Sequence, residues 1–391
     1  MDALQKLAWL SENMDLEPAE ELWLNPANPL PCQASTKKPA LEHPHIVAAK
    51  LPGGKQSPML KTLLTSACER NCNYCPFRAG RDFRRETFQP DEMAQLFTTL
   101  YHKGAVNGLF LSSGVAGGGV RTQDRLLDTA SLLRRQHYAG FLHLKLVPGI
   151  EPEQLKAAML LADRVSINLE APNPDRLGTL APLKTFYAEL LQPLVWAERI
   201  RREQSPQKTH KQRWPSLVTQ FVVGPAGETD LELISTSAYL IQSLHLARVY
   251  YSGFKPQPDT PLEDHPPENP QRIVRLYQAS FLLRDYGFDL EDLVFGGNGR
   301  LPLEVDPKVA WACANLQETP LEINTASPQE LLRVPGIGLG RVKAVLAARR
   351  IHRLRSREDL RALGIPVERS ARFLLLDGQR VARQLSLWES L

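Results

Sequence analysis

LKTLLTSACERNCNYC, residues 60–75, joins an apolar run to three cysteines spaced C-x3-C-x2-C. The run at 60–67 is almost continuously apolar, as a strand buried on both faces of a sheet should be. Cys68, Cys72 and Cys75 then follow, three of only five cysteines in the chain. An odd number of cysteines with this clustering argues against a disulfide framework and indicates metal binding or catalysis.

Five more apolar runs alternate with amphipathic stretches as far as residue 290. They lie at 108–115, 143–148, 164–172, 216–225 and 247–256. Six such βα units predict an α/β fold with a parallel sheet, and in barrels of this kind the chemistry lies at the C-terminal ends of the strands. The cysteines fall at such an end, and so do several glycines and polar residues within 112–114, 168–170 and 224–228.

The chain divides by pattern into five segments. We expect an extension at 1–58 with one helix at its start, the barrel at 59–300, a linker at 301–320, a compact second domain at 321–380 and a tail at 381–391. With 43% hydrophobic and 23% charged residues and no membrane span, the chain is expected to be a soluble globular protein. Its acidic N-terminus argues against a signal or transit peptide, so the expected compartment is the cytoplasm.

Thiolates bind both zinc and iron–sulfur clusters, so the cysteine loop allows two interpretations. A closed zinc shell would need a fourth ligand, from Cys32, Cys313 or a histidine, and none lies at zinc-finger spacing. Three cysteines can instead wrap around one cubane and leave one iron open. The spacing therefore favours an iron–sulfur cluster.

The loop resembles the signature of the radical S-adenosylmethionine (SAM) superfamily, C-x3-C-x-aromatic-C at the end of the first strand. Cys68, Cys72, Tyr74 and Cys75 match it. The resemblance implies a partial (β/α)6 TIM-like barrel, a [4Fe–4S] cluster on the three thiolates and SAM on its open iron. It also implies cleavage of SAM to a radical that abstracts hydrogen from the substrate, with electrons from a donor such as flavodoxin or ferredoxin.

Other segments resemble family motifs in the expected order along the chain. They correspond to a second-strand motif that contacts the methionine amino group, fourth-strand polar groups that reach the ribose, and a fifth-strand G-x-x-x-E segment near the adenine. The alternative is that these are ordinary polar residues at strand ends. The implied SAM contacts are Tyr74, Ser112, Ser113, Gly114, Asn168, Glu170, Gly224 and Glu228.

The segment 323-INTASPQELLRVPGIGLGRVKAVLAAR-349 predicts a helix, a tight hairpin and a second helix. Ser327 and Glu330 form a capping box, with Pro328 at the first helical position. The two glycines of the P-G-I-G turn permit torsions that aim successive N–H groups outward. They do so at the start of the second helix, where an anion is favoured.

This pattern resembles the helix-hairpin-helix motif, which binds nucleic-acid phosphate without reading sequence. A second unit at 356–378 would complete a small all-α domain. The alternative is a module that docks another protein or the barrel. The expected nucleic-acid contacts are Pro335, Gly336, Ile337, Gly338, Gly340, Arg341 and Lys343, together with Arg84 and Arg85 after the cysteine loop. For this last pair the alternative is surface ion pairing with Asp82 and Glu86.

From residue 60 to 380 the pattern resembles radical SAM proteins of DNA modification or repair, a family often associated with a uracil-DNA-glycosylase-like partner. The expected function is hydrogen abstraction from a nucleic-acid substrate, with DNA as the partner. Two alternatives stay open. One is a radical SAM enzyme that modifies tRNA or other RNA, and the other is a non-catalytic DNA-binding protein with a structural iron–sulfur cluster.

Overall fold

The computed structural model describes residues 2–11, 14, 46–50 and 56–381. The chain forms two compact units, which divide between Ile273 and Val274. Cys32 and most of the predicted tail lie outside the described residues. None of the described helices is long and apolar enough to cross a membrane.

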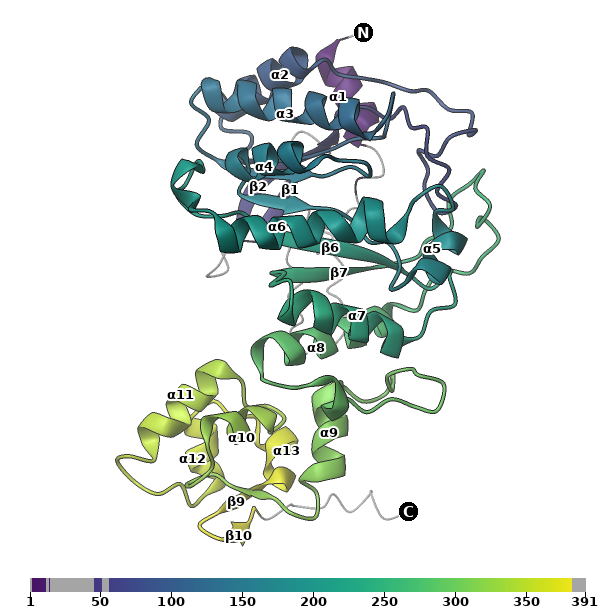
Figure 1. The fold of residues 1–391 in the computed structure, drawn as a ribbon. Coiled ribbons are helices and arrows are strands. Elements are labelled where there is room, and N and C mark those ends of the chain that lie inside the picture. Colours follow the sequence, from purple (N-terminus) through teal and green to yellow (C-terminus); the bar gives the residue numbers. More distant parts are fainter. Residues whose placement is uncertain (1, 12–13, 15–45, 51–55, 382–391) are drawn as a thin grey trace. The chain divides into compact units, whose positions relative to one another are not determined.

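The first unit is built on a seven-stranded sheet in which strands that are neighbours in space are neighbours in sequence (Figure 1). The strands are β1 (Ile46–Lys50), β2 (Gln56–Leu63), β3 (Gly108–Ser112), β4 (Phe141–Lys145), β5 (Arg164–Ser166), β6 (Ser216–Val223) and β7 (Arg248–Gly253). β2 to β7 run parallel, whereas β1 pairs antiparallel with β2. The six parallel strands confirm the predicted βα units, and their order gives a curled half-barrel.

Helices connect the parallel strands and cover the outer face of this sheet. α2 contacts α3, α3 contacts α4 and α4 contacts α6, so these four form a row (Figure 1). Right-handed crossovers between neighbouring parallel strands place such helices on one face. The helical segments are α1 (Ala3–Ser11), α2 (Pro90–His102), α3 (Gly119–Arg135), α4 (Pro152–Leu161), α5 (Pro174–Leu180), the π-helix η2 (Phe186–Leu191), α6 (Gln192–Glu203), the 3-10 helix η3 (Pro206–Lys208) and α7 (Asp230–Gln242).

The first parallel strand differs from its prediction, because β2 spans Gln56–Leu63 and not 60–67. The cause is β1, which lies in the segment predicted to have no fold of its own and pairs with the first half of β2. Pro58 lacks an N–H group, and β2 tolerates it because the ladder to β3 begins only at Met59. Beyond Leu63 the chain leaves the sheet and carries the cysteines.

The second unit is mainly helical, but it also contains a small sheet that the prediction of an all-α domain missed. β8 (Leu321–Glu322) pairs parallel with β9 (Leu374–Leu376), and β9 pairs antiparallel with β10 (Gln379–Arg380). These short strands join the two ends of the domain, which are too far apart in sequence for local propensity to reveal the pairing. The helical segments are α8 (Pro270–Asp285), η4 (Leu290–Asp292), α9 (Pro307–Asn315), α10 (Pro328–Arg333), α11 (Leu339–Ala348), α12 (Arg357–Ala362), α13 (Val367–Ser370) and η5 (Ala371–Phe373).

The second unit begins earlier than the predicted domain, since most of α8 and the predicted linker belong to it. α9 lies in that linker, and its Trp311 packs edge-on against Phe288 with ring centroids 5.6 Å apart. The guanidinium of Arg333 lies over both rings, at 4.8 Å from Trp311 and 4.6 Å from Phe288. Aromatic packing therefore places the end of the predicted barrel segment and the linker in the helical core.

Candidate active site in the first unit and hairpin in the second

A cavity opens at the C-terminal ends of the parallel strands of the first unit. It encloses about 1100 Å³, part of it open to solvent. Its lining combines residues of the cysteine loop with residues within β6 and residues at or just beyond the ends of β3, β4, β5 and β7. The predicted site residues that it brings together are Cys68, Cys72, Tyr74, Cys75, Ser112, Ser113, Gly114, Asn168 and Glu170.

The cysteine loop is held in place by backbone hydrogen bonds. The Cys75 N–H donates to the Cys72 carbonyl at 3.2 Å, and the Cys75 sulfur accepts from the Phe77 N–H at 3.4 Å. Asn73 donates its N–H to the Leu180 carbonyl at 2.7 Å and its side-chain amide to Thr179 at 2.8 Å. The end of α5 therefore fixes the middle of the loop.

The three thiols are free and face one cavity, so their chemistry can be compared with that of a metal centre. Burial raises the pKa of Cys72 and of Cys75, and the positive charge of Lys184 opposes this rise. Desolvated thiolates of this kind require positive charge, which an iron cluster provides. The donor set therefore fits an iron–sulfur cluster on three cysteines.

A closed zinc shell fits less well. Among residues 2–11, 14, 46–50 and 56–381, no three His, Cys, Asp or Glu side chains converge as the ligands of a single metal ion. Three ligands on different irons of a cubane lie further apart than three ligands of one ion. Cys313 lies on α9 in the second unit and does not line the cavity.

Gly114 explains why the end of β3 can approach the cysteine loop. A Cβ atom at this position would lie 2.3 Å from the Ala67 carbonyl oxygen and 3.2 Å from the Cys68 Cβ. The Gly114 N–H donates to the Thr65 carbonyl at 2.8 Å, which joins the two segments. Only glycine fits this contact, and so it positions the first cysteine as well as lining the cavity.

Glu170 lies beyond β5 in a backbone conformation that few residues other than glycine adopt, with φ of +66°. Its Oε1 accepts a hydrogen bond from Lys184 Nζ at 2.8 Å, and its buried Oε2 has no hydrogen-bond partner among the described residues. Burial opposes the charge on Lys184, but Cys72 and Glu170 raise the pKa of this lysine. Lys184 and Glu170 therefore form an ion pair. Burial and the Glu170 carboxylate raise the pKa of Tyr74, so the Tyr74 hydroxyl lies near this carboxylate, and Oε2 can accept from it or from a ligand hydroxyl.

Lys145 and Lys184 are cavity residues that the sequence interpretation missed. Lys145 donates to Asn168 Oδ1 at 2.6 Å and thereby orients that amide. Lys145 is the last residue of β4 and is buried. A lysine at the end of an apolar strand was a signal in the sequence that could have indicated a site residue. Lys184 follows α5 in a loop without any sequence pattern, so only the structure could reveal it.

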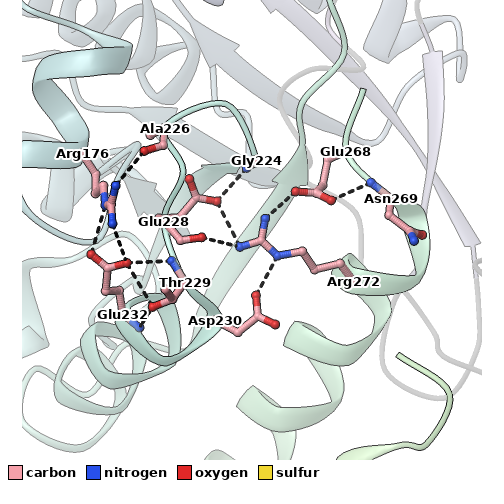
Figure 2. A network of polar contacts seen from close by, with 10 residues as sticks. All are labelled: Arg176, Gly224, Ala226, Glu228, Thr229, Asp230, Glu232, Glu268, Asn269 and Arg272. Carbon is pink, nitrogen blue, oxygen red and sulfur yellow. Dashed lines mark hydrogen bonds and ion pairs between the residues drawn. The ribbon is translucent and has the colours of Figure 1, made fainter. Parts of the chain in front are cut away.

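Gly224 and Glu228 do not line the cavity, so their position does not support the expected cofactor contact. Figure 2 shows the reason: Glu228 folds back toward the Gly224 N–H and the guanidinium of Arg272. Its Oε1 accepts from Gly224 at 2.7 Å and lies 3.2 Å from Arg272. Arg272 also pairs with Asp230 at 2.7 Å and with Glu268. This buried network holds the turn after β6.

The two arginines assigned to nucleic acid after the cysteine loop have other partners within the first unit. Arg84 pairs with Glu86 at 2.7 Å, as the surface alternative expected, and its guanidinium lies over Trp9. Arg85 donates to backbone carbonyls of the cysteine loop. Both guanidinium groups are therefore engaged by the protein itself.

In the second unit, the predicted helix, turn and helix are present at α10 and α11. The capping box of Ser327 and Glu330 with Pro328 at the first turn is confirmed. Gly336 has φ of +86°, whereas Gly338 is extended at −113°, so only the first glycine needs the left-handed region. A Cβ at Gly338 would lie 3.1 Å from the Tyr286 hydroxyl, so a glycine at this position avoids a tight contact.

Two cations bind the carbonyl groups of this turn. Arg341 donates to the Gly336 carbonyl at 2.9 Å, and Lys308 donates to the Ile337 carbonyl at 2.6 Å. Burial lowers the pKa of Lys308 to about 7. Pro335 and Ile337 are buried and support the turn, whereas Gly340 and Lys343 are exposed.

Comparison with known proteins gives a family for the first unit. Residues 62–240 match the family model described as the radical SAM superfamily. No curated protein matched the chain in sequence.

Solved structures to which the chain is similar include methylornithine synthase (PylB), at 14% identity and a TM-score of 0.45, covering 58% of this chain and 61% of that one. The hydrogenase maturase HydG from Carboxydothermus hydrogenoformans has 15% identity and a TM-score of 0.45, with 58% and 51% covered. The radical SAM methyltransferase TsrM from Kitasatospora setae, described with cobalamin and a [4Fe-4S] cluster bound, has 15% identity and a TM-score of 0.38, with 53% and 39% covered. The match thus spans between 39% and 61% of these chains.

The family match runs from the end of β2 to most of α7, and thus covers the cysteine loop and the ends of β3, β4 and β5 that line the cavity. Residues 62–240 are therefore assigned to the radical SAM superfamily, whose cofactors are a [4Fe–4S] cluster and SAM.

Proposed function

We propose that this protein is a radical SAM enzyme that modifies or repairs nucleic acid, with DNA as its substrate. The observation that carries the proposal is the concentration of positive charge in residues 321–380. Residues 321–380 contain 12 Lys and Arg against 6 Asp and Glu, a net charge of +6, whereas the whole chain has only +4. The basic excess is therefore confined to the segment that includes the hairpin, and the rest of the chain is slightly acidic.

In the first unit the side chains have separate tasks. Cys68, Cys72 and Cys75 would hold the cluster, and the polar groups of Asn168 and Glu170 would hold SAM. When bound, these cofactors supply reductive cleavage and hydrogen abstraction. Lys184 orients Glu170 through their ion pair, and apolar residues such as Phe254 line the site.

In the second unit the start of α11 is suited to an anion. Arg341 and Lys308 donate to the carbonyls of Gly336 and Ile337, so these two acceptors are satisfied within the protein. The first N–H groups of α11 have no partner within the helix, and phosphate oxygens are suitable acceptors for them. The exposed Lys343 on this helix and Arg350 just after it would add salt-dependent attraction to the nucleic-acid backbone.

The distinguishing experiment is anaerobic reconstitution of the full-length protein with iron and sulfide, followed by SAM and a reductant such as reduced flavodoxin. Release of 5′-deoxyadenosine is compared without polynucleotide and with duplex DNA, mismatched DNA or tRNA. We expect stimulation by DNA, strongest at a mismatch, because a base at a mismatch is easier to unstack. Stimulation by tRNA alone would favour the RNA-modifying alternative, and equal release in all four would overturn a polynucleotide substrate.

A further inference from the structure

The cysteine loop must leave the sheet after β2 and still present three thiols to one cavity. A loop of this kind exposes backbone carbonyls that no strand or helix satisfies, and such groups need donors. The sequence places four arginines directly after the cysteines, at positions 78, 81, 84 and 85. Their contacts show which of them provides those donors.

Arg85 donates to four carbonyls, two through each terminal nitrogen. Nη1 bonds Ser66 at 2.7 Å and Phe77 at 2.8 Å, while Nη2 bonds Arg78 at 2.7 Å and Arg81 at 3.4 Å. Ser66 lies two residues before the first cysteine, and Phe77 lies two residues after the last one. One planar guanidinium therefore joins the two ends of the loop, a task that suits its fixed fork of donors.

The guanidinium is itself held in place. It lies 4.1 Å from the ring centroid of Phe83, and that ring packs at 6.1 Å from Phe77. A cation on an aromatic face gains both electrostatic and packing stability. Arg85 is thus fixed on two sides, by carbonyls in its plane and by an aromatic ring against its face.

Two other arginines also donate to carbonyls of this loop, each to one carbonyl. Arg78 donates to the Asn71 carbonyl at 3.3 Å, and Arg81 donates to the Pro76 carbonyl at 2.9 Å. Arg84 differs, because its side chain is 52% exposed and pairs with the carboxylate of Glu86. Arg84 and Arg85 are adjacent in sequence and identical in chemistry, so they form a natural pair for comparison.

We propose that Arg85 is a positioning residue that orders the cysteine loop before the cluster binds. It touches neither the cavity nor a thiol directly in this role; it sets the separation of the two loop ends that carry Cys68 and Cys75. The proposal rests on the cysteines as cluster ligands and is independent of the nucleic-acid substrate. Lysine at this position would keep the charge but could not span four carbonyls.

The test compares Arg85→Gln, Arg85→Lys and Arg84→Gln in the full chain. After anaerobic reconstitution, the rate of iron release to a chelator is measured without SAM or polynucleotide. We expect release from Arg85→Gln to be about 10- to 100-fold faster, the range typical for residues that orient metal ligands. Arg85→Lys should be intermediate, and Arg84→Gln should match the wild type.

A second measurement examines the loop without the cluster. Hydrogen exchange of cluster-free protein should show protected amides in segment 66–81 of the wild type and of Arg84→Gln, and lost protection in Arg85→Gln. Wild-type iron release and wild-type protection in Arg85→Gln would overturn the proposal, as would equal effects of the Arg84 and Arg85 variants. If Arg85→Gln fails to fold, Arg85→Lys decides: wild-type iron release and exchange would overturn the proposal, and faster release with weaker protection would support it.

Discussion

The cysteine loop of the first unit and the hairpin of the second are both turns surrounded by basic residues, yet they use them differently. At the cysteine loop, Arg85 donates hydrogen bonds to loop carbonyls and Arg84 pairs with the carboxylate of Glu86. At the hairpin, Arg341 and Lys308 bind carbonyls, but Lys343 and Arg350 remain exposed. A cluster of basic residues in a sequence therefore does not identify a phosphate site, because backbone carbonyls compete for the same donors.

The largest expected effect is on cluster assembly, and it should distinguish a cysteine of the first unit from one of the second. Cys72→Ala should abolish cluster assembly, because two thiols cannot hold a cluster that needs three ligands. Iron content and visible absorbance after anaerobic reconstitution provide the measurement. Cys313→Ala, on α9, is the matched control and should assemble the cluster normally. Full iron content in Cys72→Ala would contradict the ligand assignment.

A buried cation that faces the cavity should contribute more to the free energy of unfolding than a more exposed cation. Lys184→Met leaves Glu170 buried without its partner, and we expect a loss of about 3–5 kcal/mol in the free energy of unfolding. The double variant with Glu170→Gln should recover part of it. Lys6→Met, which breaks the more exposed pair with Glu92, should cost no more than about 1 kcal/mol. Chemical denaturation measures all three, and equal losses for Lys6 and Lys184 would refute the distinction.

The carbonyl-bound lysine of the hairpin should give the second unit a pH dependence. Lys308 has a pKa of about 7 when folded and an ordinary value of 10.5, so the unfolded chain binds more protons between these values. Stability should therefore rise with pH across that window, by up to about 1.4 kcal/mol per unit. Amide exchange of α11 at several pH values tests this. Lys308→Met should remove the rise and Lys343→Met should keep it; an unchanged slope in Lys308→Met would rule out this origin.

The smallest expected effect concerns the exposed basic residues. Lys343→Gln should weaken DNA binding uniformly across sequences and reduce the salt dependence of the logarithm of affinity by about one. Lys103→Gln, an exposed lysine at the end of α2, is the control and should leave the slope unchanged. Titrations at several salt concentrations measure the slope. The same slope in both variants would exclude Lys343 from the binding surface.

The sequence predicted the parallel strands and most of the cavity because these depend on local patterns. Apolar runs located β3 to β7, and the cysteine spacing located the loop at the end of β2. The sheet partners were harder to predict, since the pairing of β1 with β2 shifts β2 by four residues from the apolar run. Glu228 does not line the cavity, since it pairs with Arg272, 44 residues away, and a G-x-x-x-E pattern cannot show that the side chain folds back.

What the sequence by itself determined were features of short range: three thiols in one loop, the capping box at Ser327 and the periodicity of the βα units. These follow from spacing and propensity, which act within a few residues. The tertiary structure alone decided which donors meet which acceptors, as for Lys184 with Glu170, Lys308 with the hairpin and Arg85 with the loop ends. Hydrogen bonds and ion pairs are short in space, so their partners are fixed only when the fold brings distant segments together.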